Sequence, residues 1–589
     1  MDQALQAPGF AGLAPDRAVE TRLVEGRWQA VAWDLGTGRR RVLTDRPDGV
    51  DLSEIEPDGA QVWWFDADTS GEGSWQRQPF ASGGPAEALP GLPRGRAYGI
   101  AFDRAGSLAA VGLGVGGESR CYVGVPGGEA RLVGSAAGYV SLADLSPDGR
   151  LLALGGRPDG EDAVLLWPTE PARLRRTQPP VRLPGSRRRR LWPIEFDPAG
   201  GPDPELLLVA EQDERYTVAT WRAGHGLRLF PGLSFGSEIS VGWYRDERDK
   251  RDARGILVQQ ERAGRSHLFA ADLDSGRLRS VRTPGGTIHD LSCAPDGTLH
   301  CLWSREAVPP RALLIPPGGQ AVDPAPTAAD PARRGRRWTP TRYGRIHSFV
   351  STPPGEGPWP TLFLVHGGPA THDRDSYEPS ADAFTRRGYA VVRTNYRGST
   401  GYGARWQHEF DHRVGLAQIE DLAAVRAALV ADGVAAAGRT GLCGFSWGGY
   451  LALLAMGAQP RLWSLGMAAY PIADYPAAYR ATTPALRAID QELFGGTPQQ
   501  VPERYHAASP LTYVHQVRSP VLLIASPADE RCPAEQVARY AKELDRSAVP
   551  HELLWVDGGH RSRRAADHDV VFAAMLRFTA RSWPTPPPP

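Results

Sequence analysis

The chain has 589 residues, of which 41% are apolar, and this length is enough for two or three packed cores rather than one small module. Its 67 basic and 67 acidic residues give a formal net charge of zero. Because nucleic acids and anionic membranes attract an excess of positive charge, the composition predicts neither as a partner. The 67 glycines and 53 prolines are interspersed with apolar runs, which indicates many short strands rather than disorder.

The N-terminus and the cysteines bear on the compartment. Met1 to Arg17 carry acids and prolines but lack the apolar core of a signal peptide, and no run of about 18 apolar residues occurs. The five cysteines are scattered and form no Cys-x-x-Cys pair, so we expect free buried thiols rather than disulfides or a zinc site. Together these features predict a cytoplasmic protein.

A repeated turn of the Pro-Asp-Gly type precedes an apolar strand at five places in the first half of the chain. The turn glycines are Gly59, Gly106, Gly149, Gly200 and Gly297, and they lie 47, 43, 51 and 97 residues apart. The last interval is close to twice the others, and a period in the high forties is typical of a propeller blade. A β-sandwich with common turns is the alternative, but it gives no reason for such a period.

A second repeated element supports blades. Asp34 to Gly38 and Asp272 to Gly276 share an Asp-x-x-x-Gly hairpin pattern that suits the outer turn of a blade. About 320 residues at this period give about seven blades. We therefore predict an all-β propeller over residues 1–335.

The composition changes between Pro316 and Arg337, where Pro, Gly, Ala and Arg dominate. This stretch predicts a surface crossover with a domain boundary near residue 335. Beyond it, apolar runs alternate with amphipathic segments, which predicts a mostly parallel sheet covered on both faces over residues 336–589. The predicted strands are Arg345–Thr352, Thr361–His366, Tyr389–Asn395, Arg439–Cys443, Pro520–Ser526 and Glu552–Val556, and the predicted helices are Val414–Ala431, Gly449–Ala458, Ala534–Leu544 and Ala565–Arg577.

A Gly-x-Ser-x-Gly sequence follows one of these strands. Gly444, Ser446 and Gly448 stand between the strand that ends at Cys443 and a helical run. Two glycines that flank a serine allow the sharp strand-to-helix turn that exposes its hydroxyl, so Ser446 is the predicted nucleophile of an α/β-hydrolase domain. The alternative is a serine that only caps the helix.

A serine needs a base to take its proton, and in this fold the acid and the histidine follow in that order. Asp529 comes after the apolar strand Val521 to Ile524, and His560 comes after Leu553 to Val556. Asp529 could instead cap the next helix, Asp557 is a rival acid, and His560 could be a solvated loop histidine. We favour Ser446, Asp529 and His560 as the catalytic residues.

Two backbone donors must meet the oxyanion of the tetrahedral intermediate. The residue after the nucleophile and a glycine loop after an early strand commonly supply them. These are the N–H groups of Trp447 and of Gly368, which lies in His366-Gly367-Gly368-Pro369. His366 itself is predicted to be structural, with a ring that holds the loop.

On these residues the chain resembles the prolyl oligopeptidase family (S9) of serine peptidases, in its acylaminoacyl-peptidase and dipeptidyl-peptidase-like bacterial branch. The segments that carry the resemblance are His366 to Pro369, Asn395 to Gly403, Gly444 to Tyr450, Asp529 to Pro533, and Gly559 with His560. The predicted propeller extends the resemblance over essentially the full length.

The resemblance implies that Ser446, Asp529 and His560 act at the interface of the two domains while the propeller screens substrates by size. It also implies a short peptide, an N-acylated residue or an aminoacyl amide as substrate, with no metal or organic cofactor. Relatives are often dimers or higher oligomers, so a homo-oligomer is possible. The N-terminal segment is shorter than the family's usual lead-in, which leaves the completeness of the first blade open.

Substrate-binding residues are less well defined. Arg531 or Arg561 could meet a substrate carboxylate by a bidentate contact, although solvated arginines are the simpler interpretation in a chain so rich in arginine. In the propeller, Glu72 and Glu211 to Glu214 are candidates for holding an unblocked α-amine, with solvated turns as the alternative.

The leading functional hypothesis is therefore a serine peptidase that acts on short peptides through an acyl-enzyme at Ser446. Aminopeptidase, dipeptidyl, acylaminoacyl, carboxypeptidase and endopeptidase modes stay open because one triad serves all of them. An esterase or small-amide hydrolase with the same triad is an alternative, although it would not need a propeller. A non-catalytic propeller scaffold is the third.

Overall fold

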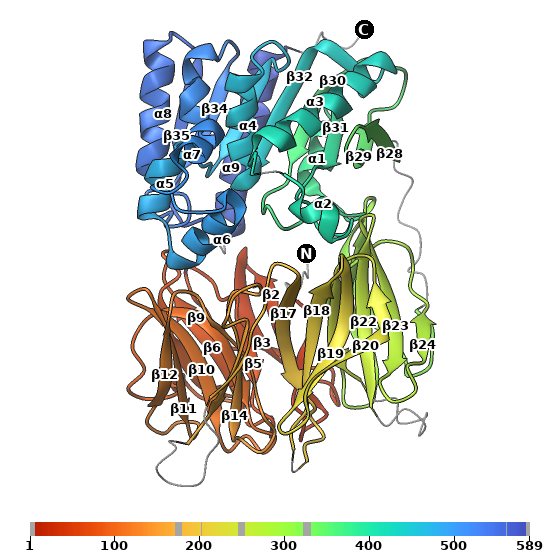
Figure 1. Ribbon diagram of the computed structural model, residues 1–589, viewed down its shortest axis with the longest axis vertical. Coiled ribbons are helices and arrows are strands. Elements are labelled where there is room, and N and C mark those ends of the chain that lie inside the picture. Colours follow the sequence, from red (N-terminus) through yellow and green to blue (C-terminus); the bar gives the residue numbers. More distant parts are fainter. Residues whose placement is uncertain are drawn as a thin grey trace. The chain divides into compact units, whose positions relative to one another are not determined.

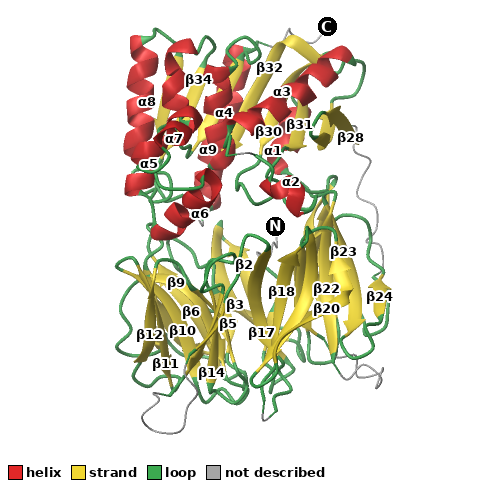
Figure 2. Ribbon diagram, in the orientation of Figure 1, coloured by secondary structure: helices red, strands yellow, loops and turns green. Residues whose placement is uncertain are grey.

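The computed structural model describes residues 6–170, 180–201, 203–244, 254–321, 332–410, 412–560, 562 and 564–584. The chain forms two compact units. The first unit comprises Met1–Ser304 with Pro310–Ala325, and the second comprises Arg305–Pro309 with Pro326–Pro589. Among the described residues, strands make up the regular structure of the first unit, while the second combines strands with helices (Figure 2).

The first unit contains seven small antiparallel sheets, which confirms the predicted propeller (Figure 1). The first four sheets are β1 (Gly9–Phe10), β2 (Arg17–Val24), β3 (Arg27–Asp34) and β4 (Arg40–Val42); β5 (Ser53–Ile55), β6 (Gln61–Ala67), β7 (Gly73–Pro79) and β8 (Ala86–Glu87); β9 (Arg96–Phe102), β10 (Ala109–Val115), β11 (Glu118–Gly124) and β12 (Arg131–Ala137); β13 (Ser141–Leu145), β14 (Leu151–Gly155), β15 (Val164–Pro168) and β16 (Val181–Leu183). The last three are β17 (Arg189–Phe196), β18 (Leu206–Gln212), β19 (Arg215–Arg222) and β20 (Gly226–Phe235); β21 (Ile239–Trp243), β22 (Gly255–Arg262), β23 (Arg265–Asp272) and β24 (Leu278–Val281); β25 (Thr287–Cys293), β26 (Leu299–Arg305) and β27 (Val308–Ile315).

The five turn glycines of the repeat occupy one position in their sheets, between the first and the second strand. All have positive φ: 71° at Gly59, 69° at Gly106, 71° at Gly149, 72° at Gly200 and 81° at Gly297. Glycine adopts this conformation without steric penalty, which is why it recurs. The double interval before Gly297 spans the sixth sheet, whose link from β21 to β22 lies mostly outside the described residues.

The second repeated element forms the turn between the third and fourth strands of a sheet. Asp34 Oδ1 accepts a hydrogen bond from the N–H of Thr37 at 2.8 Å, and Asp272 Oδ1 accepts one from the N–H of Ser275 at 2.7 Å. The Asp side chains thus close these turns by bonding to the backbone three residues further on. This is the outer turn that the sequence predicts.

Carboxylates on the first strand of several sheets bond to the backbone of the next sheet. Asp144 accepts from the N–H of Phe196 at 2.7 Å, and Glu195 accepts from the N–H of Trp243 at 2.6 Å. Asp290 of the last sheet accepts from the N–H of Ala7, just before β1, at 2.8 Å. The same type of bond therefore connects neighbouring sheets and joins the last sheet to the N-terminal segment.

Within the described residues the first sheet has four strands and the last has three, so the shorter sheet is not the first one, whose completeness the sequence left open. The rings of Phe10 and His300 lie 4.9 Å apart and add an apolar contact between these two sheets. The ring of sheets is thus joined by side-chain contacts as well as by the bond from Ala7.

The second unit is built on one eight-stranded sheet. Its strands are β28 (Arg333–Thr341), β29 (Gly344–Thr352), β30 (Trp359–Val365), β31 (Ala390–Asn395), β32 (Ala435–Phe445), β33 (Leu465–Ala469), β34 (Val521–Ala525) and β35 (His551–Trp555). The order is β28-β29-β31-β30-β32-β33-β34-β35, with antiparallel pairing at β28, β29 and β31 and parallel pairing from β31 onward. This is the mostly parallel sheet that was predicted.

Helices cover both faces of this sheet. They are α1 (Pro379–Thr385), α2 (Ala404–His408), α3 (Leu416–Ala431), α4 (Trp447–Ala458), α5 (Tyr475–Ala481), α6 (Pro484–Phe494), α7 (Pro502–Ala508), the 3₁₀ helix η1 (Pro510–Gln516), α8 (Ala534–Arg546) and α9 (Ala565–Ser582). One core packs α3, α4 and α8 against the sheet, and a second core packs α1 and α9. The predicted propeller and α/β-hydrolase architecture is confirmed.

The predicted crossover from Pro316 to Arg337 is wrong at its end, because β28 begins at Arg333. Most side chains of β28 are exposed or half-buried, as expected for the strand at the edge of a sheet. Such a strand needs few apolar residues, so its composition is that of a loop. Residues 322–331 of the crossover lie outside the described part of the chain.

Candidate active site

Ser446 stands on a sharp turn between β32 and α4. Its backbone has φ 55° and ψ −119°, a conformation that is rare for a residue with a side chain. A Cβ on Gly444 would lie 2.3 Å from the carbonyl carbon of Gly448, and a Cβ on Gly448 would lie 1.9 Å from the carbonyl oxygen of Val365. Only glycine fits at both positions, so the Gly-x-Ser-x-Gly pattern follows from the close packing of this turn.

The hydroxyl of Ser446 begins a chain of hydrogen bonds. Its Oγ lies 3.0 Å from Nε2 of His560, and Nδ1 of His560 lies 2.8 Å from Oδ2 of Asp529. The three residues follow β32, β34 and β35, whose carboxyl ends meet at one edge of the sheet because these strands are parallel. The structure thus brings together the three residues selected from the sequence, while the rival Asp557 is exposed.

Asp529 is held by its own loop. Its Oδ1 accepts hydrogen bonds from the N–H groups of Arg531 at 2.9 Å and Cys532 at 2.8 Å, which leaves Oδ2 for the imidazole. The side chain is almost fully buried. Helix α8 has Pro533 at its N-cap, so Asp529 does not have the capping role considered from the sequence. A buried carboxylate fixed in this way orients the histidine ring and stabilises its positive charge.

The loop after β30 lies against the nucleophile. A Cβ on Gly367 would be 3.4 Å from the carbonyl oxygen of Phe445 and 3.9 Å from Cβ of Ser446. Trp447 is the first residue of α4, so helix bonding leaves its N–H free. Within the described residues, no acceptor is found for the N–H of Trp447 or for that of Gly368. Both donors are available to a ligand.

The side chain of His366 contacts this loop and the segment after β31. Its Nδ1 lies 2.8 Å from the carbonyl oxygen of Gly367 and its Nε2 lies 2.9 Å from Oγ of Ser399. The imidazole stacks on the ring of Tyr396 at 4.2 Å, and burial lowers the pKa of His366 to about 3. A neutral, enclosed imidazole suits the structural role predicted for it.

Two residues beside the triad were missed from the sequence. The thiol of Cys532 contacts the hydroxyl of Ser446, and burial raises the pKa of this thiol well above its usual range. The ring of Tyr470 lies 5.8 Å from that of His560. The position of Cys532, three residues after the acid on a tight loop, was a signal that the thiol would face the site. All five cysteines are free, and four are buried, but Cys293 is only half-buried, contrary to expectation.

One group of side chains in the described part of the chain has the composition of a metal site. Asp529, Cys532 and His560 offer ligand atoms that lie within 4.8 Å of one another. The imidazole and the carboxylate are already bonded to each other, so an ion here would compete with the hydrogen bonds of the triad.

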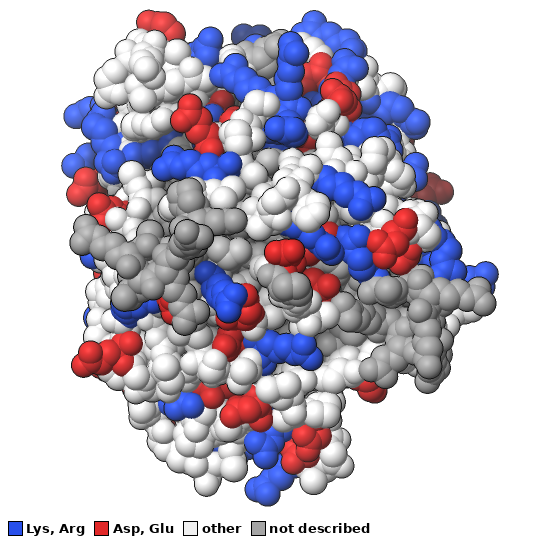
Figure 3. Space-filling model, turned by 60° about the horizontal axis from the view of Figure 1, so that its bottom comes forward, with Lys and Arg blue, Asp and Glu red and all other residues white. Residues whose placement is uncertain are grey.

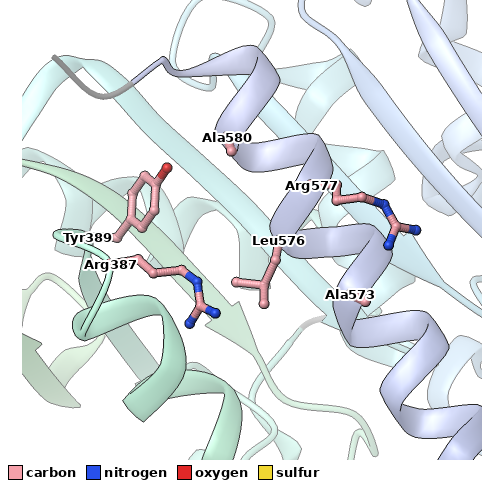
Figure 4. A pocket seen from close by; sticks show the side chains of 6 residues that line it. All are labelled: Arg387, Tyr389, Ala573, Leu576, Arg577 and Ala580. Atoms are coloured by element: carbon pink, nitrogen blue, oxygen red, sulfur yellow. The ribbon is translucent and has the colours of Figure 1, made fainter. Parts of the chain in front are cut away.

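One cavity lies near the triad, and another lies away from it. A cavity of about 190 Å³ lies behind the turn and is lined by residues that include His366, Gly367, Gly444 and Phe445. Another of about 480 Å³ lies between α9 and the start of β31 (Figure 4). The lining of the second consists of Arg387, Tyr389, Ala573, Leu576, Arg577 and Ala580, which offers no acid and base pair for hydrolysis.

The remaining candidates are less informative. The backbone N–H of Arg531 donates to Asp529, and its carbonyl accepts from Oγ1 of Thr482 at 3.0 Å. Arg561 lies outside the described residues. In the propeller, Glu211 pairs with Arg190 at 3.1 Å and Glu72 is exposed. Glu211 is thus already engaged by an arginine and Glu72 faces solvent, so neither acid is placed to bind an amine.

Basic and acidic side chains are interspersed on the face of the molecule in Figure 3, without a patch of one sign. This agrees with the balanced composition and offers nothing for a polyanion on that face. Among the described helices, none is long and apolar enough to cross a membrane.

An α/β-hydrolase sheet with a serine on a strained turn, a histidine and a buried aspartate defines the class of the serine hydrolases. Comparison with known proteins gives the family. Residues 376–583 match the model of the prolyl oligopeptidase family, which confirms the resemblance seen in the sequence and assigns this domain to that family.

Curated relatives are similar over part of their length. The dipeptidyl peptidase family member 6 of Caenorhabditis elegans is 26% identical over 35% of this chain and 29% of its own. The acylamino-acid-releasing enzyme of Rattus norvegicus is 24% identical over 55% of this chain and 48% of its own. The chain thus spans about half or less of the length of these relatives.

Solved structures share the fold over nearly the whole chain. A puromycin-hydrolyzing peptidase of Mycobacterium tuberculosis superposes with a TM-score of 0.80 at 21% identity, over 99% of this chain and 94% of that one. An acylaminoacyl peptidase of Pyrococcus horikoshii superposes with a TM-score of 0.72 at 16% identity, over 97% and 95%. At these identities the likeness concerns the fold.

Proposed function

We propose that this protein is a serine peptidase that hydrolyses short peptides through an acyl-enzyme at Ser446. The observation that carries the proposal is the continuous relay of hydrogen bonds from Ser446 through His560 to Asp529. The family match of residues 376–583 supports it. Acylaminoacyl, dipeptidyl and puromycin-hydrolysing relatives share its fold or part of its sequence.

In this mechanism the hydroxyl of Ser446 attacks the carbonyl carbon of the peptide bond, and Nε2 of His560 takes the hydroxyl proton. Asp529 keeps the imidazole in the required tautomer and stabilises the imidazolium. The N–H groups of Trp447 and Gly368 then donate to the oxyanion. His560 returns the proton to the leaving amine, and a water molecule releases the acyl group by the same steps in reverse order.

The residue that recognises the peptide's end belongs to this proposal as well. Arg531 or Arg561 is proposed to meet a free carboxylate of the substrate, as one route to a carboxypeptidase mode. If Arg531→Gln and Arg561→Gln leave the kinetics on free-acid and amidated peptides unchanged, this part of the proposal is wrong.

A digest of a peptide library, followed by mass spectrometry, tests the main proposal. We expect the wild-type protein to cleave short peptides at a constant distance from one terminus, and Ser446→Ala to cleave none. The distance distinguishes aminopeptidase, dipeptidyl, acylaminoacyl, carboxypeptidase and endopeptidase modes. Turnover of p-nitrophenyl esters without cleavage of any amide would instead support the esterase alternative. Absence of both would support a scaffold.

A further inference from the structure

A carboxylate that is mostly buried near the candidate active site has no partner among the described residues. Helix α6 (Pro484–Phe494) turns two side chains inward, those of Asp490 and Phe494. They are four residues apart and therefore lie on the same face of the helix, one turn from each other. Asp490 is only 8% exposed, so most of its side chain lies inside the domain.

A cluster of aromatic rings connects this face of α6 to the nucleophile. The ring of Phe494 lies 5.0 Å from that of Tyr475 and 4.0 Å from that of Tyr505. Tyr475 in turn lies 5.1 Å from Tyr450 and 6.4 Å from Trp447, the residue directly after Ser446. The rings thus form one connected cluster that extends from the residue after Ser446 to the helix that carries Asp490.

The negative charge of Asp490 acts on the tyrosine hydroxyls of this ring cluster and on the thiol of Cys532. Together with burial, which is the larger cause, it raises the pKa of the hydroxyls of Tyr450, Tyr475 and Tyr505. It is also among the charges that raise the pKa of Cys532, whose thiol contacts Ser446. The carboxylate is therefore within electrostatic reach of the residues around the nucleophile.

No group in the described residues satisfies this carboxylate. It takes part in no hydrogen bond and no ion pair there, and burial alone raises its pKa to about 7. Two of the neighbouring hydroxyls donate elsewhere, Tyr450 to the carbonyl of Val414 and Tyr505 to that of Gly496. The hydroxyl of Tyr475 and Nε1 of Trp447 are fully buried and have no partner in the part of the chain that the structure describes.

Buried carboxylates in proteins are ordinarily paired or hydrogen-bonded, because an unpaired one is costly. A purely structural role would leave a donor next to it, as Asp474 shows on the neighbouring helix α5. Asp474 is 5% exposed, and its carboxylate caps α5 and binds Nη1 of Arg539 at 2.8 Å. Asp490 has no such donor, and a cation from a ligand would supply one.

We propose that Asp490 is a specificity residue that receives a basic side chain, arginine or lysine, of the substrate residue whose carbonyl carbon Ser446 attacks. This inference rests on the proposed peptidase function and deepens it. The chemistry fits, because aromatic faces attract a guanidinium or ammonium group and a carboxylate can bind a guanidinium through two hydrogen bonds. On substrate binding, the carboxylate of Asp490 would form an ion pair with the basic side chain of the substrate.

The test compares coumarylamide substrates of arginine, citrulline and phenylalanine, each with a free and with an acetylated α-amine. Citrulline has the shape of arginine without its charge. For the wild-type protein we expect kcat/KM to be about 100-fold higher for arginine than for citrulline, since a buried charge pair can contribute that much. In Asp490→Asn this ratio should fall to about one, while turnover of the phenylalanine substrate changes little.

Asp474→Asn is the matched control, because it removes a buried carboxylate that already has partners. It should leave the ratio of arginine to citrulline turnover unchanged. An unchanged ratio in Asp490→Asn would overturn the proposal, as would an equal loss on all three substrates. A wild-type ratio near one would also overturn it. Thermal unfolding of each variant checks that it is folded.

A binding measurement separates this inference from the proposed function. If the wild-type protein cleaves neither these amides nor the peptide library, the peptidase proposal fails, and calorimetric titration with agmatine still tests Asp490. Agmatine carries the guanidinium of arginine on a short chain. We expect binding to wild type and to Ser446→Ala, and at least 10-fold weaker binding to Asp490→Asn. Equal affinity for wild type and Asp490→Asn would contradict the role of Asp490.

Discussion

Buried and half-buried carboxylates are used differently in the two units of this protein. In the propeller, Asp144, Glu195 and Asp290 each accept a backbone N–H from a neighbouring part of the ring. In the hydrolase domain, Asp529 accepts two N–H groups from its own loop and turns its other oxygen to His560.

Burial by itself does not separate these roles. It raises the pKa of Asp144 to about 7, and it raises the pKa of Asp490 to about 7 as well. The partners do separate them, because Asp144 has backbone donors and Asp490 has none in the described residues. An acid whose oxygens accept only backbone N–H groups stabilises the fold. An acid that bonds to a histidine, or that has no partner among the described residues, is available for chemistry or binding.

The largest expected effect is that of Asp529→Asn. The amide oxygen can still accept from the loop, but the amide group presents the wrong donor to His560 and favours the wrong tautomer. We expect kcat on a cleaved peptide to fall about 10⁴-fold while the fold is kept. Steady-state kinetics and thermal unfolding check both parts. A loss of less than 10-fold would show that Asp529 does not orient the imidazole.

Glycines sharpen the contrast between the units. The turn glycine Gly276 of the propeller, with φ 69°, has open space around it, whereas a Cβ on Gly448 would overlap the carbonyl of Val365. We expect Gly448→Ala to destabilise the protein by about 3 kcal/mol or more, with loss of activity. Gly276→Ala should cost only about 1 kcal/mol, from its backbone conformation. Equal unfolding midpoints in denaturant would contradict this difference.

Removal of a carboxylate that connects two sheets should have a moderate effect. In Asp144→Ala the N–H of Phe196 loses its acceptor inside the protein, so we expect a loss of about 1–3 kcal/mol at pH 6. The control is Asp162→Ala, which breaks an exposed ion pair with Arg182 and should cost about 0.5 kcal/mol or less. Denaturant unfolding measures both variants. If they are equally stable, the bonds between sheets contribute little.

At pH 4 the smallest effect is expected for the stability of Asp490→Asn, but this effect depends on pH. The folded-state pKa of about 7 is above the ordinary aspartate value of 3.8, so the folded protein holds its proton more tightly than the unfolded chain. The contribution of Asp490 to stability is therefore full below pH 4 and is lost as the pH rises to 7.

Asp490→Asn lacks this decline. We expect it to equal wild type at pH 4 and to be more stable by about 4 kcal/mol at pH 8, because the pKa of Asp490 is raised from 3.8 to about 7 and each pH unit corresponds to about 1.4 kcal/mol. The facing groups Tyr450, Tyr475, Tyr505 and Cys532 have raised pKa values and stay neutral over this range. A variant that is less stable than wild type at pH 8 would mean that the carboxylate has a structural partner.

Much of the fold was predictable because it repeats or alternates. The turn glycines at a regular interval gave the propeller, and apolar runs that alternate with amphipathic segments gave the parallel sheet. Helix α6 was missed although Thr483 and Pro484 begin it, Gly495, at φ 74°, ends it, and its apolar residues recur at a helical spacing. The edge strand β28 was missed because its side chains are mostly exposed.

The triad was accessible from the sequence because each member follows a recognisable strand. Ser446 also lies between two glycines that the close packing of the turn requires. Asp490 gave no such signal, since one acid in a short helix looks like any exposed side chain. Its helix packs through Phe494 against Tyr475 and Tyr505, which come from other elements of the chain. Only the packed structure shows that it lacks a partner.

The central claim is that Ser446 is made nucleophilic by His560, and covalent labelling tests it most directly. After treatment with a fluorophosphonate, intact-mass and peptide mass spectrometry should find one adduct, located on Ser446. The adduct should be absent in Ser446→Ala and strongly reduced in His560→Ala. A folded wild-type protein that stays unlabelled, or that carries its adduct on another residue, would contradict the account.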